Sequence, residues 1–348
     1  MATTILTDAI EPSVFAPYVQ ELSLEKSLLI KSGIVQRNAE LDTFLVGGGQ
    51  IIEMPRWEDL SDINEANVSS TDATPAVIDS VGSVQENGVR HNRNKVFGAR
   101  DLVAALAGSN PMDVIANRFA SWWERHDQRL LLDIVAGIML EDADSAGGAD
   151  LVNLVGVDGS VAAAENKFSA NNLLDTFQLL GDGKNDIAAI ACHSYIHTEM
   201  IKQDLIDFRP DSEANIGFGT YMGKTLLVDD GLTVDTTTDD GASPPNSQPL
   251  YDTLCFAPGA FQLGIGSPGV PVEVDRDALS GLGGGEEFIV SRREFVLHPV
   301  GFSYQTAAAG NGASPTNTAL ALTGAYDRTE APLVSRQRAQ RMVTLRSN

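Results

Sequence analysis

The stretch 110–140, NPMDVIANRFASWWERHDQRLLLDIVAGIML, is the longest strongly periodic segment of this 348-residue chain. Asn110 suits an N-cap, Pro111 suits the first helical position, and Asp113 places a negative charge in the first turn. Apolar and aromatic positions then recur at steps of three and four, namely Met112, Ile115, Phe119, Trp122, Trp123, His126, Leu130, Ile134 and Ile138. This spacing predicts one helix with an apolar stripe, a rod of roughly 45 Å.

The overall charge and the cysteine content argue against several classes of protein. The chain has 24 Lys and Arg against 47 Asp and Glu, a formal net charge of −23. Proteins that read nucleic acids use basic patches to neutralise phosphates, so this balance argues against that role. Cys192 and Cys255 lie far apart in apolar surroundings, which indicates two buried, reduced thiols. The sequence predicts neither a signal peptide nor a membrane span.

The segments before the rod have little to bury against within themselves. Residues 1–46 are expected to form an arm that contains a helix at 19–31. A hinge of three glycines at 47–49 begins a long loop, 47–97, with β segments expected at 50–57, 76–84 and 88–97. A short helix is expected at 101–107. Because an isolated two-stranded ribbon is marginally stable in water, the loop is expected to rest on another subunit.

Helix and strand patterns alternate after the rod. The expected helices are 169–180, 194–206 and 316–327, and the expected buried strands are 186–192 and 225–228. The sequence APGAF predicts a tight turn between short strands within 251–262, and further β structure is expected at 286–305 and 342–345. Residues 151–275 are therefore expected to form a compact α/β lobe within an α+β protein.

The order of these parts resembles the major capsid proteins of tailed bacteriophages. The segments that carry the resemblance are IIEMPRWEDLSD (51–62), HNRNKVFGARDLVAALAGSNPMDVIANRFASWWERHDQRLLLDIVAGIM (91–139), IAAIACHSYIHTEM (187–200), YMGKTLLVDDGL (221–232), LYDTLCFAPGAF (250–261), REFVLHPVGFSY (293–304) and RMVTLRSN (341–348). The resemblance implies an N-terminal arm, an extended β-hairpin loop, a peripheral domain with a long spine helix, and an axial α/β domain. The corresponding residues are 1–46, 47–97, 98–150 and 151–275, with return strands of the peripheral domain and the C-terminal segment at 276–348.

This resemblance implies a structural protein and not an enzyme. The chain would assemble as pentamers and hexamers into an icosahedral shell that encloses double-stranded DNA without sequence-specific binding. Its implied partners are copies of itself, a separate scaffolding protein, a portal and a decoration protein, with no cofactor and no membrane. Assembly would take place in the host cytoplasm and the product would be the virion capsid.

Two alternatives to a capsid stay open at this point. An encapsulin-like protein compartment has the same fold but needs a pocket for a cargo peptide, which the sequence does not identify. An acidic soluble enzyme would use the lobe at 151–275. If the arm clamps neighbouring subunits, deletion of residues 1–32 is expected to abolish shells and leave a folded lobe.

Two possible catalytic or ligand-binding motifs are incomplete. The sequence GKT at 223–225 matches the end of a phosphate-binding loop, but Phe218 stands where the first glycine is required, and a strand is expected to follow. His193 and His197 have the spacing of zinc ligands, but Ser194 occupies the position of the zinc-protease glutamate. No catalytic, cofactor-binding or metal-binding residue is therefore assigned.

The charged clusters allow both a binding and a solvated interpretation. The aspartate pairs Asp229–Asp230 and Asp239–Asp240 could contribute to a divalent-ion site, but no calcium-loop spacing surrounds them, so solvated turns are expected. A basic run could dock against an acidic patch of a neighbour or form a solvated face. The basic run is Arg90, His91, Arg93, Asn94 and Lys95, and the acidic patch is Glu58, Asp59 and Asp62.

Four aromatic side chains are expected to serve packing. Trp57, Trp122 and Trp123 are interpreted as packing residues or subunit contacts. His126 falls within the apolar stripe of the rod and is expected to be half-buried and satisfied.

Overall fold

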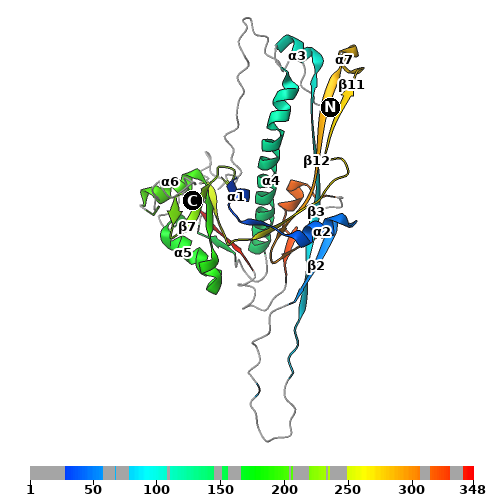
Figure 1. Ribbon diagram of the computed structural model, residues 1–348. Coiled ribbons are helices and arrows are strands. Elements are labelled where there is room, and N and C mark those ends of the chain that lie inside the picture. The colour runs from blue at the N-terminus through cyan, green and yellow to red at the C-terminus, as the bar shows by residue number, and fades with distance from the viewer. Residues whose placement is uncertain are drawn as a thin grey trace.

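The computed structural model describes residues 28–57, 67, 78–107, 110–144, 151–155, 166–203, 205–206, 219–232, 234–235, 249–305, 314–329 and 340–348. In Figure 1 a long helix, α4, runs beside two long strands, and a compact lobe lies on the other side of this helix. The described helices include none that combines the length and the apolar character needed to cross a membrane.

Helix α4 (Pro111–Asp144) confirms the predicted rod and extends it by one turn at its C-terminal end. Its second half is buried on most sides, whereas the first half is buried on one side only. The buried apolar residues of the second half are Leu130, Leu131, Leu132, Ile134, Val135, Ile138 and Met139. The second half therefore stabilises the fold, and the first half keeps apolar surface for other contacts.

A six-stranded sheet extends along α4. Its strands, in sheet order, are β1 (Val35–Arg37), β10 (Phe261–Ile265), β12 (Glu286–Pro299), β3 (Ser83–Arg100) and β2 (Ile51–Trp57), with β11 (Val272–Asp277) added beside β12. Strands β3 and β12 are antiparallel over eleven residue pairs, from Arg100–Glu286 to Arg90–Val296. Because β2 pairs with the first half of β3, and β11 with the first half of β12, the sheet has one long ribbon at each end.

A second, seven-stranded sheet forms the lobe. Its strands, in sheet order, are β4 (Val152–Leu154), β15 (Met342–Ser347), β9 (Leu250–Phe256), β5 (Ala189–Cys192), β7 (Lys224–Val228) and β6 (Thr220–Tyr221), with β8 (Val234–Asp235) beside β9. Helices α5 (Ala170–Gln178) and α6 (Ser194–Lys202) and the 3-10 helix η3 (Gly181–Asp186) belong to the same lobe. The predicted helices at 169–180 and 194–206 and strands at 186–192, 225–228 and 342–345 are therefore confirmed, although most have different ends.

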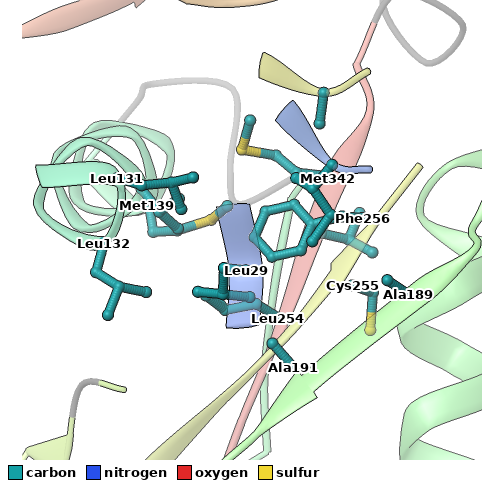
Figure 2. Close-up of a cluster of buried hydrophobic side chains, with 14 of the residues drawn as sticks. Leu29, Leu131, Leu132, Met139, Ala189, Ala191, Leu254, Cys255, Phe256 and Met342 are labelled. Atoms are coloured by element: carbon teal, nitrogen blue, oxygen red, sulfur yellow. The ribbon is translucent and has the colours of Figure 1, made fainter. Parts of the chain in front are cut away.

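The core is continuous between α4 and the lobe. Figure 2 shows Leu131 and Met139 of α4 near Leu29 of the N-terminal helix α1 (Leu28–Lys31) and Leu254 of β9. These residues belong to one cluster of buried side chains, which also contains Met342 of β15. Burial of apolar surface therefore holds the lobe and the helix together.

Two strands join a different sheet from the one that the sequence interpretation implied. Strands β9 and β10 flank the APGAF turn, but they do not form a hairpin, because β9 enters the seven-stranded sheet and β10 the six-stranded one. Gly259 supplies the positive φ of 67° at this crossing. Strand β15 is not a return strand of the peripheral domain but lies inside the lobe, where four of its first five residues are buried.

Two other predicted elements differ from the structure. The expected helix at 316–327 is only the short α8 (Asn317–Leu320), and β14 (Tyr326–Arg328) follows and pairs with β13 (Phe302–Tyr304). The helix ends with Ala321 as its C-cap, and Gly324, with a φ of 78°, lies in the turn that leads to β14, where its amide donates to Glu141. The expected strand at 76–84 is regular only from residue 83 onward, and residues 76 and 77 lie outside the described part of the chain.

The described part of the expected arm packs on its own chain. Strand β1 pairs in parallel with β10, and helix α2 (Ala39–Val46) buries Leu41 and Leu45 against the same sheet. Leu29 is completely buried. An arm of 1–46 is therefore wrong for residues 28–46. Deletion of residues 1–32 would remove part of the core, so a truncation should end at residue 27.

A buried hydrogen bond joins α4 to the lobe. The Gln128 side-chain amide donates to Asp229, and the exposed fractions of these residues are 2% and 6%. We expect Gln128→Leu to lower the free energy of unfolding by about 2 kcal/mol, because a buried carboxylate loses a donor. Urea denaturation measures this change. The exposed-site control Gln178→Leu should stay within about 0.5 kcal/mol of the parent; equal effects of the two substitutions would contradict the role of the buried bond.

Candidate functional site

The GKT sequence at 223–225 lies in a hairpin and not at the start of a helix. Met222 and Gly223 form the turn between β6 and β7, with φ values of 50° and 76°. The Lys224 amine donates to the backbone carbonyl of Ile187 at 2.6 Å and lies over the Phe177 ring. This lysine therefore ties the hairpin to the lobe, in a geometry that differs from a phosphate-binding loop.

The two histidines and the aspartates beside them lie around the start of α6. His193 is the N-cap residue, its Nδ1 accepts from the amide of Tyr195, and its Nε2 lies 3.7 Å from Asp230. Asp230 in turn accepts from the Ser194 amide at 3.1 Å, and hydrogen bonds from the Ser194 side chain and, to a smaller extent, from its backbone lower the pKa of the Asp230 carboxyl group. Burial lowers the pKa of His197. The polar atoms of His193 and Asp230 thus have structural partners.

No metal centre is evident where the structure is described. Among those residues, no group of three or more His, Cys, Asp and Glu side chains is arranged to hold an ion. Asp229 accepts from the Gly231 amide as well as from Gln128, and Asp239 and Asp240 lie outside the described residues. Cys192 and Cys255 are both free and buried, and burial raises the pKa of the Cys192 thiol to about 12.

Side chains of the basic run on β3 make contacts within their own chain. Arg90 forms an ion pair with Glu294 at 3.0 Å, and His91 is completely buried. Arg93 donates to Asn317 of α8, and burial lowers its pKa. Lys95 lies 5.3 Å from the Trp122 ring centroid. Arg90 therefore ties β3 to β12, and Arg93 and Lys95 contact α8 and α4. The acidic residues to which the run was predicted to dock, 58, 59 and 62, lie outside the described part of the chain, so docking stays a prediction.

An aromatic cluster lies between β3 and the first half of α4. Phe97 makes edge-to-face contacts with Phe119 and Trp122, and the His126 ring stacks on Trp122 at 5.3 Å. Trp123 is buried, and its ring nitrogen donates to Ser291 of β12. A mostly apolar cavity of about 210 Å³ opens beside this cluster. The periodicity of the sequence predicted that the tryptophans lie on the apolar stripe of the helix, but it could not predict the cavity beside them.

The base of the β2–β3 ribbon is fixed by buried polar contacts. Glu86 of β3 lies 3.0 Å from His298 of β12 and accepts from Thr329, and the Asn87 amide donates to Ser303 of β13. Charged residues are rarely buried unless they are paired, so this cluster holds the ribbon at a defined angle to the sheet. No local sequence pattern predicts this cluster, because the partners are more than 200 residues apart.

Large apolar side chains are exposed along the ribbons at both ends of the molecule. The exposed fractions of Trp57 and Ile78 on the β2–β3 side are 77% and 92%. At the opposite end the exposed residues are Leu102, Leu106, Val272, Val274, Leu279 and Leu282. Exposed large apolar side chains that gather at the ends of a molecule indicate sites of protein association. The arrangement therefore suits contacts with other chains over the whole length of the molecule.

Comparison with known proteins gives a clear sequence match. The chain is 32% identical over 334 residues to the "Major capsid protein" of Bacillus phage SPP1, covering 95% of this chain and 96% of that protein. No protein-family profile matches the chain.

Solved structures show the same fold at low sequence identity. The "Capsid of Ralstonia phage GP4" matches with a TM-score of 0.59 at 9% identity and covers 99% of this chain and 98% of its own. The "Cyanophage Pam1 capsid asymmetric unit" matches with a TM-score of 0.57 at 9% identity, covering 85% and 93%. The head structure of Helicobacter pylori bacteriophage KHP40 matches with a TM-score of 0.55 at 9% identity, covering 100% and 98%.

Proposed function

The chain belongs to the major capsid proteins of tailed bacteriophages, and from this premise we propose that it assembles as pentamers and hexamers into an icosahedral shell around double-stranded DNA. The observation that carries the proposal is the exposed apolar surface of the two ribbons, with Trp57 77% exposed on one and Leu282 fully exposed on the other. Such surface is unfavourable in a monomer and is covered when copies close into a lattice.

We propose that the parts of the chain divide this work. The β2–β3 ribbon within 47–97 forms the extended loop. The clamping role predicted for the arm falls to residues 1–27, which lie outside the described part of the chain. The six-stranded sheet with α4 forms the peripheral domain, and the seven-stranded lobe, including β15, forms the axial domain that meets its copies at capsomer centres. The buried cluster at Glu86 and His298 would fix the loop at the angle that the lattice requires.

The charge of the chain supports enclosure of DNA without sequence-specific binding. A formal net charge of −23 leaves few cations to release counterions from DNA, so packaged DNA would slide along the inner wall. A separate scaffolding protein, a portal and a decoration protein are the proposed partners, and assembly is placed in the host cytoplasm. We assign the chain no enzymatic role.

Size measurements on the full chain test the proposal. We expect light scattering and negative-stain microscopy to show closed shells, tubes or capsomer-sized rings, either from the chain alone or with its scaffolding protein. Shells that form without a scaffold and enclose foreign protein would favour an encapsulin-like compartment. A monodisperse monomer or dimer under both conditions would contradict assembly and favour an enzyme that uses the lobe.

The contribution of the arm is tested by a truncation that respects the core. We expect deletion of residues 1–27 to abolish closed shells while the circular dichroism spectrum and the unfolding transition stay close to those of the full chain. The reason is that the completely buried Leu29, which belongs to the fold, is retained. Normal shells from the truncated chain would contradict a clamping role for the arm.

A further inference from the structure

The β11–β12 hairpin ends in a tip that presents two leucines to solvent. Leu279 is 86% exposed and Leu282 is fully exposed. Leu282 also has a left-handed backbone, with a φ of 59°, which is unfavourable for a residue with a branched side chain. Strain and exposed apolar surface at one residue indicate a contact that the isolated chain does not make.

The tip is held rigidly on its own chain. The Asp101 amide donates to the Gly285 carbonyl at 3.2 Å, and Arg276 pairs with the Asp101 carboxylate. The Ser280 hydroxyl donates to Glu286 at 2.6 Å. Strand β12 is itself paired with β3 along its length, so the tip cannot fold back onto α4 of the same molecule. A preorganised tip binds with a small loss of conformational entropy.

The chain also carries a matching cavity near the same end of the molecule. The cavity of about 210 Å³ lies between β3 and the first half of α4, and its apolar lining consists of Phe97, Val114, Ile115, Phe119 and Trp122. Figure 1 places the first half of α4, α7 (Ser280–Gly283) and β11 at the upper end of the molecule. The lining is apolar and partly exposed, which suits aliphatic side chains from another molecule.

The charges around the tip and the cavity are complementary. Asp275 and Asp277 lie on β11, all of whose residues are exposed. Arg118 and Arg125 line the cavity, and Lys95 lies over the aromatic rings beside it. Opposite charges at the rim of an apolar contact favour one orientation of the two partners.

We propose that the leucine tip of one subunit inserts into the aromatic cavity of a second copy of the same chain. This inference rests on the proposed shell function and identifies the surface that joins capsomers. The contact is head-to-tail, and in the closed shell of the proposed function successive contacts of this kind are expected to form a ring around a symmetry axis. The ring leaves the lobes free to meet their own copies elsewhere.

The first test uses Leu282→Asn under conditions in which the parent chain forms shells. Asparagine tolerates the left-handed backbone, so the variant keeps the hairpin turn. We expect pentamers and hexamers at normal yield and a fall in closed shells of about tenfold or more. Shells at the parent yield would overturn the inference. Loss of the pentamers and hexamers as well would overturn it too, because the tip would then act within capsomers; absence of any assembly by the parent contradicts the shell function instead.

The second test is a disulfide cross-link between the two surfaces. The double variant Leu282→Cys with Ile115→Cys is assembled and treated with diamide, which oxidises facing thiols; the native Cys192 and Cys255 are buried and do not compete. We expect covalent multimers on a non-reducing gel, limited to the ring size. The control pair Leu282→Cys with Leu154→Cys, whose second site is 63% exposed on the lobe, should give none.

Two cross-linking results would identify a different occupant. Multimers from Leu282→Cys alone would show that tips meet each other and would overturn the inference. Multimers from Ile115→Cys combined with Trp57→Cys, but not with Leu282→Cys, would show that the β2–β3 ribbon of a neighbour fills the cavity, which also overturns it.

Discussion

Replacing Gly137 by alanine is expected to lower the free energy of unfolding by about 3 kcal/mol. A Cβ at this position in α4 would lie 2.1 Å from the backbone oxygen of Leu320 in α8. The clash involves backbone, so no side-chain rotation relieves it. Helix propensity alone predicts the opposite sign, a gain of about 1 kcal/mol, because alanine is the better helix former. The sign of the change therefore distinguishes close packing from local propensity.

Urea denaturation of the unassembled chain measures this effect. The control Ala120→Gly makes the reverse exchange at an exposed position of the same helix and should cost about 1 kcal/mol through propensity only. Adding Leu320→Ala to Gly137→Ala should not restore stability, because the oxygen that clashes belongs to the backbone. A Gly137→Ala variant as stable as the parent would show that α8 does not approach α4 closely.

The sequence predicted helix α4 correctly because its signal is local. Apolar residues at steps of three and four specify one helical stripe without any knowledge of partners. The sheet to which β10 and β15 belong could not be predicted in the same way. Strand β15 pairs with β9, which lies about 90 residues earlier in the chain. The sequences of β10 and β15 are short apolar runs, and such runs are compatible with several positions in a sheet.

The basic run on β3 shows where a usable signal was missed. In a strand, alternate residues share a face, so residues 91, 93 and 95 point the same way. In the structure, His91 and Arg93 are buried or half-buried between β3 and the helices, whereas Asn92 and Asn94 are exposed. The interpretation of residues 90–95 as one basic run did not take this alternation of faces into account. The fold then required partners for Arg93, which Asn317 supplies from far along the chain.

The burial of His91 predicts that the folded chain loses stability in acid. His91 is completely buried, and within the described residues neither of its ring nitrogens has a hydrogen-bond partner. Burial, with smaller contributions from Arg93 on β3 and His126 on α4, lowers the pKa of His91 from 6.5 to about 3. Below pH 6.5 the unfolded chain binds a proton that the folded chain excludes, so stability falls as the pH decreases toward 3.

We expect this histidine to cost about 2.7 kcal/mol of unfolding free energy between pH 7.5 and pH 4.5. Substitution by Phe or Leu removes the group, so His91→Phe and His91→Leu should both escape this part of the loss, although carboxylates still titrate in each protein. Urea denaturation at the two pH values, compared between parent and variants, isolates the contribution. Equal losses in parent and variants would contradict it.

The variants also separate the two costs of the buried imidazole. At pH 7.5 the ring is neutral in both the folded and the unfolded chain, so a gain from His91→Leu or His91→Phe at this pH does not involve protonation and reports the removal of the two buried nitrogens together with the change in packing. Leaving buried polar atoms without partners costs about 1–3 kcal/mol, so a variant that packs well against Phe295 should be more stable than the parent even there. The difference between parent and variant should then widen as the pH falls, because protonation of the unfolded chain adds to a cost that is already present.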